Sequence, residues 1–399
     1  MLVTKVVVRL KIYKAYKFRM YPDECTKSKL NSFMGTSRFI YNHYLELKDK
    51  YYNELNINYN ISDMKKDIKN LENEYPWLKD IDSMASRNTL DDLNRSYTNF
   101  FQKRSSHPKF KCKNNHDTYR TTAIRGSYNG KEYSNIKVDL ENKMIKLPRL
   151  DSIKIRGYRN LKIFDDKKIL NATVSKEAGK YYVSVCTEED ITLNSFILRY
   201  GVGIDLGVKN LVIMSSGVKY DAMNKTDKYE KKIKGLNRWL TRSKKGGKNR
   251  EKIKLKLQRA YQKLRNARKY YTHLITKEIT DNNDLIAVEN LNTNNMIEEA
   301  STKNFRKKIL DSSMREVLRQ IKYKSLWKNK KVIEASRYFK SSQRCSHCGN
   351  INSGTKNLSV RKWECSKCHS INDRDINASI NILMEGIEKY YKEHLELVK

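Results

Sequence analysis

Apolar and basic side chains alternate along residues 4–21, TKVVVRLKIYKAYKFRMY. A period of two predicts a β-strand with one face toward a core and the other available to phosphate groups. Pro22 ends this pattern, and from Asp23 to Phe101 the apolar residues recur at every third or fourth position. This spacing predicts helices whose solvent-facing side carries basic residues, and one of these helices covers 83–103.

Short strand-like runs return between Pro108 and Tyr200, separated by turn signals such as Gly179-Lys180. They predict a small antiparallel barrel or sandwich. Because residues 4–21 have the same character, we interpret the helical residues as an insertion into a barrel. Aromatic and basic residues alternate early in this region and are candidates for stacking on nucleobases: Tyr119, Arg120, Arg125 and Tyr128.

A different pattern begins at Gly201, where GVGIDLGVKNLVIM predicts a β-hairpin whose return strand covers 211–214. Asp205 lies within the apolar first strand, on the opposite face from Ile204. A carboxylate there is costly unless it is paired or binds a cation. By itself the residue also fits an ordinary turn aspartate beside a glycine.

Residues 228–273 are strongly basic and have helical periodicity, interrupted at Gly246-Gly247. They predict a helical hairpin with a cationic face suited to nucleic acid. The run 285–288 (LIAV) then predicts a buried central strand that ends in Glu289, although a glutamate at an exposed strand end is an equal alternative. A helix over 312–328, a strand over 332–335 and a last helix from Asp375 follow.

Two Cys-x-x-C pairs lie just before that last helix. Their spacing is typical of two knuckles that bind one zinc ion, and four thiolates make a closed structural site. The alternative is a redox role, and His347 and His369 are further possible ligands that four cysteines make unnecessary. The predicted zinc ligands are Cys345, Cys348, Cys365 and Cys368.

Three carboxylates, Asp205, Glu289 and Asp375, can converge if these elements form an RNase H-like fold. Oxygen ligands without His or Cys favour Mg²⁺ or Mn²⁺. Two such ions, about 3.5–4 Å apart, would support hydrolysis of a phosphodiester. Asp373 is a candidate helix cap, with an outer ligand as the alternative.

Composition also indicates a nucleic-acid partner. The 399 residues include 82 Lys and Arg against 45 Asp and Glu, a formal net charge of +37. The positive electrostatic field of such a charge attracts polyanions, so we expect nucleic acid to bind. The sequence contains no run of 18 apolar residues, so it predicts no membrane-spanning helix. Cys25, Cys112 and Cys186 are isolated, as expected of a protein from a reducing compartment.

These motifs occur in a recognisable order: KAYKFRMYP, SRFIYNHYL, PKFKCK, KLPRL, GIDLG, SKKGGKNREK, AVENL, CSHCG, WECSKC and NDRDINASINI. In this order they resemble the TnpB proteins of IS200/IS605-type transposons, relatives of the type V CRISPR nucleases, over nearly the whole chain. The chain departs from that pattern by about ten extra N-terminal residues and by Asn372 where many relatives have His.

The resemblance implies a multidomain α/β protein with an RNase H-like (RuvC) nuclease domain. A wedge barrel would cover residues 1–21 and 108–199, with a helical recognition lobe at 22–107 between them. The nuclease would cover 200–339 and 371–399, interrupted by a zinc ribbon at 340–370 that lies near the target strand. Asp205, Glu289 and Asp375 match the family's catalytic, magnesium-binding acids.

The resemblance also implies the activity and the partners. The protein would be an RNA-guided endonuclease that cuts double-stranded DNA beside a short adjacent motif, using a guide RNA from the transposon end. We expect a monomeric protein within a cytoplasmic, nucleoid-associated ribonucleoprotein. Two alternatives are an RNA-guided binding protein without nuclease activity, which is expected to lose one of the acids, and an RNase H-like transposase that acts without RNA.

Overall fold

The computed structural model describes residues 8–113, 116–128, 131–157, 163–164, 167–193, 198–223, 227–291, 293–357 and 359–396. The chain divides into two compact units. One comprises Lys11–Asp190, and the other comprises Met1–Leu10 with Ile191–Lys399. Among the described helices, none is both long and apolar enough to span a membrane.

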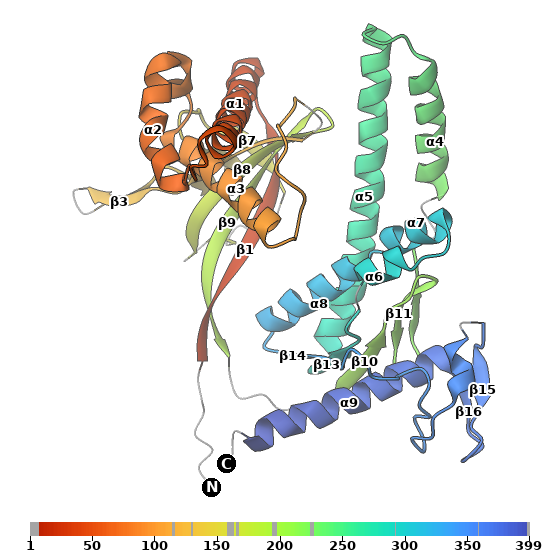
Figure 1. Ribbon diagram of the computed structural model, residues 1–399. Coiled ribbons are helices and arrows are strands. Elements are labelled where there is room, and N and C mark those ends of the chain that lie inside the picture. Colours follow the sequence, from red (N-terminus) through yellow and green to blue (C-terminus); the bar gives the residue numbers. More distant parts are fainter. Residues whose placement is uncertain are drawn as a thin grey trace. The chain divides into compact units, whose positions relative to one another are not determined.

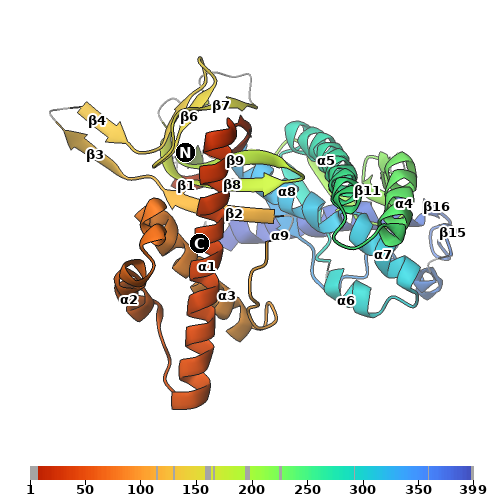
Figure 2. The ribbon, with the colours of Figure 1, turned by 90° about the horizontal axis from the view of Figure 1, so that it is seen from above.

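The unit Lys11–Asp190 contains a seven-stranded sheet in the order β2-β8-β9-β1-β7-β6-β5. A separate hairpin, β3–β4, projects away from this sheet (Figure 2). The strands are β1 (Val8–Tyr21), β2 (His116–Thr122), β3 (Arg125–Tyr128), β4 (Lys131–Ser134), β5 (Lys137–Asp139), β6 (Met144–Lys146), β7 (Ile153–Arg156), β8 (Lys168–Glu177) and β9 (Lys180–Leu193).

Helices cover this sheet at one side (Figure 1). They are α1 (Glu24–Leu55), α2 (Ile61–Glu74), the 3-10 helix η1 (Pro76–Asp80) and α3 (Ser83–Phe101). Asp23 caps α1 by accepting a hydrogen bond from the Thr26 amide at 2.7 Å. Asn60 caps α2 in the same way, as expected for side chains of this type before a first turn. The helical prediction for 23–101 is therefore confirmed.

The described strands of this unit form an open sheet with β2 and β5 at its edges, so the expected closed barrel is not seen among them. Another prediction needs correction: Tyr119 is only 4% exposed and packs edge-on against Phe33, so it cannot stack on a nucleobase. Its position on β2, between the sheet and α1, buries the ring. The Tyr128 side chain and the turn at 129–130 lie outside the described residues.

The second unit is built on a five-stranded sheet in the order β12-β11-β10-β13-β14. β10 and β13 are parallel, as are β13 and β14, whereas β11 and β12 extend the sheet antiparallel. The predicted hairpin at Gly201 and the predicted central strand are thus confirmed. The strands are β10 (Gly201–Asp205), β11 (Asn210–Met214), β12 (Lys219–Asp221), β13 (Leu285–Val288) and β14 (Lys331–Glu334).

Helices cover both faces of this sheet. Side chains such as Ile204 and Ile286 pack against Ile279 of α5 and Val317 of α8 on one face, whereas Leu285 and its neighbours pack against α9 on the other. β13 is buried on both sides, which explains its uninterrupted apolar sequence. The helices are α4 (Asp227–Arg242), α5 (Lys248–Asn282), α6 (Thr293–Glu298), α7 (Lys303–Asp311), α8 (Met314–Trp327) and α9 (Arg374–Glu396).

Helix α9 lies very close to β10 and β13 (Figure 1). A Cβ atom added at Gly203 would lie 1.9 Å from the Ser379 carbonyl oxygen, and one at Gly386 would lie 2.5 Å from the Ala287 Cβ. Glycine is therefore required at Gly203 by the approach of the α9 backbone and at Gly386 by the Ala287 side chain. This contact fixes the start of α9 relative to the ends of the central strands.

A cysteine knuckle, residues 340–370, connects β14 to α9. It contains the 3-10 helix η3 (Ser353–Lys356) and β15 (Lys362–Glu364), which pairs antiparallel with β16 (Ile371–Asp373). β16 leads directly into α9. In its small core, Trp363 packs with Cys345 and Cys365.

Candidate active site and cysteine cluster

Asp205 and Glu289 lie at the same edge of the central sheet. β10 and β13 are parallel neighbours with Ile204 opposite Val288. The residue that follows each of these is acidic, Asp205 at the end of β10 and Glu289 just after β13, so both carboxylates lie at the carboxyl ends of the strands. Apolar strands buried between helices hold both side chains in place. The sequence predicted both acids, and the parallel register brings them together.

Asp375 is the second residue of α9, which packs on β10 and β13. Oδ1 of Asp373 accepts hydrogen bonds from the amides of Asp375 and Ile376, both at 3.1 Å, so the prediction of a helix cap is confirmed. Oδ2 of Asp373 pairs with Lys219 at 2.7 Å. The cap therefore connects the helix start to β12 and orients Asp375.

All three acids line one cleft of about 1050 Å³. Burial, followed by the charges of Glu289 and Asp375, raises the pKa of Asp205 to about 7. Burial likewise raises the pKa of Glu289. Carboxylates concentrated in this way repel one another unless a cation or a proton compensates their charge.

Two arginines that sequence reasoning missed also line the cleft. Arg361 of the cysteine knuckle places Nη1 3.1 Å from Oδ2 of Asp375, and Arg374 places its own Nη1 3.5 Å from Oδ1. Arg374 is anchored by its Nε, which donates to the Thr355 carbonyl at 3.0 Å. Arg374 is part of a motif already noted, but no sequence signal marks Arg361, because only folding of the knuckle brings it to the cleft.

Hard divalent cations fit this donor set. The three acids supply only oxygen atoms, their own repulsion favours a bound cation, and the arginines at Asp375 already provide partial compensation. In the part of the chain that the structure describes, however, only the four cysteines bring three or more such ligand atoms within 4.8 Å of one another. Metal binding by the acids therefore remains a prediction.

The four cysteines form a compact cluster. Sγ of Cys345 is 3.7 Å from that of Cys368, and Sγ of Cys348 is 3.5 Å from that of Cys365. Four sulfurs at the usual Zn–S length of about 2.3 Å would be about 3.8 Å apart, so the cluster fits zinc. Burial opposes ionisation of Cys345, but hydrogen bonds from Ser370 and from backbone amides lower its pKa to about 6.

The two pairs have matching backbone turns. The Gly349 amide donates to the Cys345 carbonyl at 2.8 Å, and the His369 amide donates to the Cys365 carbonyl at 2.9 Å. The His369 ring contacts Glu364 at 3.0 Å instead of the cluster. The thiols therefore suffice as a ligand set, and the cluster suggests a structural zinc site.

The knuckle is also connected directly to α9. Asn377 accepts from the Ser346 amide at 2.8 Å and donates to the Arg344 carbonyl at 2.7 Å. Asn381 donates to the carbonyls of Arg344 and Ser341 at 2.6 and 2.8 Å. The cysteine cluster thereby supports the helix turn that carries Asp375.

The fold and these two sites define a class: a two-unit α/β protein with an acidic cleft at parallel strand ends and a four-cysteine knuckle before its last helix. Three family models match the chain. They are "Probable transposase" over 185–300, "Cas12f1-like, TNB domain" over 315–382, and "Helix-turn-helix domain" over 12–56. Residues 12–56 here form most of strand β1 and the whole of helix α1, rather than two short helices.

Relatives extend this match to nearly the whole chain. The chain is 31% identical over 391 residues to the "Putative RNA-guided DNA endonuclease InsQ" of Escherichia coli K12, covering 94% of this chain and 93% of that protein. It is 27% identical over 380 residues to a "Putative RNA-guided DNA endonuclease" of Streptomyces pristinaespiralis, covering 94% and 90%. The chain belongs to the TnpB family of IS605-type transposons.

The fold is also similar to that of a solved structure with much lower sequence identity. The protein chain of a cryo-EM structure of a Cas12f1–sgRNA–target DNA complex matches with a TM-score of 0.55 at 14% identity, covering 93% of this chain and 98% of that one. This confirms the multidomain α/β fold at the level of architecture. The predicted resemblance to TnpB is confirmed by the relatives above.

Proposed function

We propose that this protein is an RNA-guided DNA endonuclease of a transposon, which hydrolyses guide-matched double-stranded DNA in the cleft of Asp205, Glu289 and Asp375. The observation that carries the proposal is the convergence of these three acids, from 205, 289 and 375 in the sequence, on one cleft. The near end-to-end relation to proteins named as RNA-guided DNA endonucleases supports it.

The acids would hold Mg²⁺ through their carboxylate oxygens. When bound, the metal would supply an activated water and neutralise charge on the scissile phosphate. Asp205 and Glu289 would remain fixed by their buried strands, and the Asp373 cap would orient Asp375. Because Asp205 and Asp375 lie in a strand and a helix and Glu289 directly follows a buried strand, the site needs little reorganisation when substrate arrives.

Cations at the rim of the cleft would guide the substrate. Lys209, Lys307 and Lys308 line it, together with Arg361 and Arg374. Their positive charge would attract the phosphate backbone toward acids that would otherwise repel it. Base pairing with the guide would supply sequence specificity, consistent with a large net charge spread along the chain.

We further propose the domain plan expected from the sequence. Residues 200–339 and 371–399 would form the RuvC-like nuclease, and 340–370 the zinc ribbon. Residues 22–107 would form the helical recognition lobe, and 1–21 with 108–199 the wedge domain, here containing an open sheet among its described strands. The protein would act in the cytoplasm as a monomer within its ribonucleoprotein.

The test is to express the gene with its native downstream flank, purify the protein and sequence the RNA that copurifies. We expect one RNA with a fixed scaffold and a variable end, which then directs Mg²⁺-dependent cleavage of a matched duplex. Asp375→Ala should abolish cleavage but keep guide-dependent DNA binding. Heterogeneous fragments without a discrete RNA would contradict the proposal and favour a transposase that acts without RNA.

A further inference from the structure

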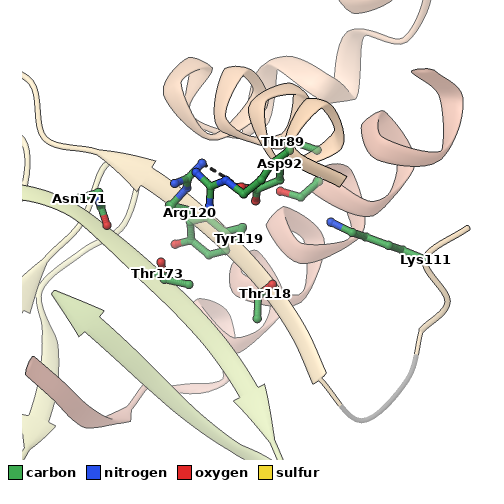
Figure 3. A pocket seen from close by; sticks show the side chains of 10 residues that line it. Thr89, Asp92, Lys111, Thr118, Tyr119, Arg120, Asn171 and Thr173 are labelled. Atoms are coloured by element: carbon green, nitrogen blue, oxygen red, sulfur yellow. Dashed lines mark hydrogen bonds and ion pairs between the residues drawn. The ribbon is translucent and has the colours of Figure 1, made fainter. Parts of the chain in front are cut away.

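A second cavity, of about 320 Å³, lies within the unit Lys11–Asp190, among α1, α3, β2, β8 and the segment that precedes β2. Figure 3 shows the side chains of Arg120, Tyr119, Thr173 and Lys111 surrounding one space. The cavity is lined mainly by hydroxyl and cationic groups. It belongs to a different unit from the acidic cleft and has no part in the mechanism above.

Three residues that line this cavity each have a buried polar atom without a hydrogen-bond partner among the described residues. The atoms are Oγ of Ser37, Oη of Tyr119 and Nε of Arg120. Ser37 is 5% exposed and Tyr119 is 4% exposed, so bulk water does not readily reach either side chain. Buried polar groups are nearly always paired, so three unpaired ones around one cavity indicate a missing partner.

The cavity also has excess positive charge. Arg95, Lys111 and Arg120 line it against the single carboxylate of Asp92, which pairs with Nη2 of Arg120 at 2.9 Å. The net formal charge of the lining is thus three minus one, or +2. Water would satisfy the unpaired hydroxyl groups but would not compensate this charge, whereas an oxyanion would do both.

Lys111 is held in place before any ligand arrives. Its backbone amide donates to Oδ1 of Asn42 at 2.7 Å, and its carbonyl accepts from Nδ2 of the same residue at 2.9 Å. Its ammonium lies 3.8 Å from the ring centroid of Tyr41. This anchoring to α1 fixes a flexible side chain at the cavity and lowers the entropy cost of binding.

We propose that this cavity binds one phosphodiester group of nucleic acid. A phosphate would accept from the hydroxyl groups of Ser37 and Tyr119 and from Nε of Arg120, and its charge would be compensated by Arg95 and Lys111. That the nucleic acid is guide RNA or target DNA rests on the proposed function. Binding of phosphate itself does not.

The first experiment uses the protein alone with inorganic phosphate as the probe. Thermal unfolding is compared in phosphate and chloride at equal ionic strength. We expect phosphate to raise the unfolding temperature of the wild type and to have at most a third of that effect on Arg95→Ala/Lys111→Ala. The matched control Arg104→Ala/Lys109→Ala removes two exposed charges from the chain segment that precedes Lys111, and neither residue lines the cavity. Equal effects on both double variants would overturn the proposal.

Tyr119→Phe separates a ligand-binding role from a structural one. It removes a buried hydroxyl group that has no hydrogen-bond partner in the part of the chain that the structure describes, and it leaves the packing against Phe33 intact. We expect the phosphate-free variant to be at least as stable as the wild type and its stabilisation by phosphate to fall. A variant less stable without phosphate but equally stabilised by it would show that the hydroxyl group is structural and would contradict the proposal.

The second experiment identifies the source of the phosphate in the assembled ribonucleoprotein. Single linkages in the guide RNA, or in the target DNA, are replaced by neutral methylphosphonates. We expect one linkage at which the replacement weakens wild-type binding about tenfold and has no further effect on Arg95→Ala/Lys111→Ala. The strand in which it lies identifies the partner. Equal losses in both proteins at every linkage would refute the site, while guide-dependent binding by the wild type would still support the proposed function.

Discussion

Arg361 and Asp375 form an ion pair across the acidic cleft, with Nη1 of the arginine 3.1 Å from Oδ2 of the carboxylate. The arginine belongs to the cysteine knuckle and is half exposed, whereas the carboxylate is 15% exposed on the helix that follows. The guanidinium therefore occupies space beside an acid that is proposed to hold a cation. The knuckle supplies a residue to the cleft as well as supporting it.

Arg361→Ala should have opposite effects on metal affinity and on rate. Removing a positive charge beside Asp375 should lower the Mg²⁺ concentration needed for half-maximal cleavage by about two- to fivefold, as for a partly exposed ion pair. The rate at saturating Mg²⁺ should fall, because one cation facing the phosphate is lost. Titration of cleavage with Mg²⁺ tests both effects. Lys367→Ala, also an exposed knuckle cation, should change neither.

Asp205→Asn should stabilise the metal-free protein and abolish cleavage. The substitution removes one of three carboxylates that repel one another in the cleft, so in EDTA we expect the unfolding temperature to rise by about 2–4 °C. Mg²⁺ should stabilise the wild type more than the variant. A variant that unfolds earlier than the wild type in EDTA would show that Asp205 has a structural role instead.

Cys365→Ser should release zinc and impair the acidic cleft indirectly. Zinc content measured by mass spectrometry should fall from about one ion per chain toward zero, since a structural site needs all four ligands. Cleavage should decrease because the knuckle positions the first turns of α9 through Asn377 and Asn381. Cys112→Ser, an exposed cysteine outside the cluster, should retain both zinc and activity. A zinc-free Cys365→Ser protein with full activity would contradict this coupling.

Gly203→Ala should be strongly destabilising. Its Cβ would lie 1.9 Å from the Ser379 carbonyl oxygen, so β10 and α9 would have to separate at a cost of about 2–4 kcal/mol. Gly235→Ala in α4 is the control, because its Cβ would meet no atom of the described residues within 4 Å. There we expect a gain of about 0.5–1 kcal/mol from the better helix propensity of alanine. Denaturant unfolding measures both, and a mild effect at Gly203 would contradict the close approach.

Glu316 should make stability depend on acid pH. Its hydrogen bonds with Arg319, both at 2.7 Å, lower its pKa to about 2. Because the pKa lies below the unfolded value of about 4.3, the contribution to stability is present above pH 4.3 and is lost as the pH falls toward 2. Glu316→Gln should therefore unfold about 1–3 °C below the wild type at pH 7, with a smaller gap at pH 3. Thermal scans across this range test the sign, and a gap that widens in acid would contradict it.

The local sequence pattern was sufficient to predict most helices and strands of the chain. The apolar run before Glu289 predicted a strand buried on both faces, and β13 is such a strand. The helical hairpin around Gly246 and the cap at Asp373 also follow from short stretches of sequence. These features depend on neighbouring residues, so periodicity and side-chain type reveal them.

The local sequence pattern was insufficient where burial or strand pairing depends on residues far away in the sequence. Tyr119 alternates with basic residues as a surface aromatic would, but α1 covers it. The strands of residues 1–21 and 108–199 were expected to form a barrel, whereas the described strands make an open sheet with β2 and β5 as its edges. Strand pairing and helix docking decide both points, and neither has a local signature.

The sequence by itself identified the family, and it predicted the four clustered cysteines and the three acids, because each of these depends on residue type, spacing and order. The tertiary structure alone decided that parallel pairing of β10 and β13 sets Asp205 beside Glu289, and that the knuckle brings Arg361 to Asp375. It also decided that Ser37, Tyr119 and Arg120, from different elements, surround one cavity with unpaired groups. Such contacts join residues far apart in sequence, and their energies depend on burial and distance, which exist only in the folded chain.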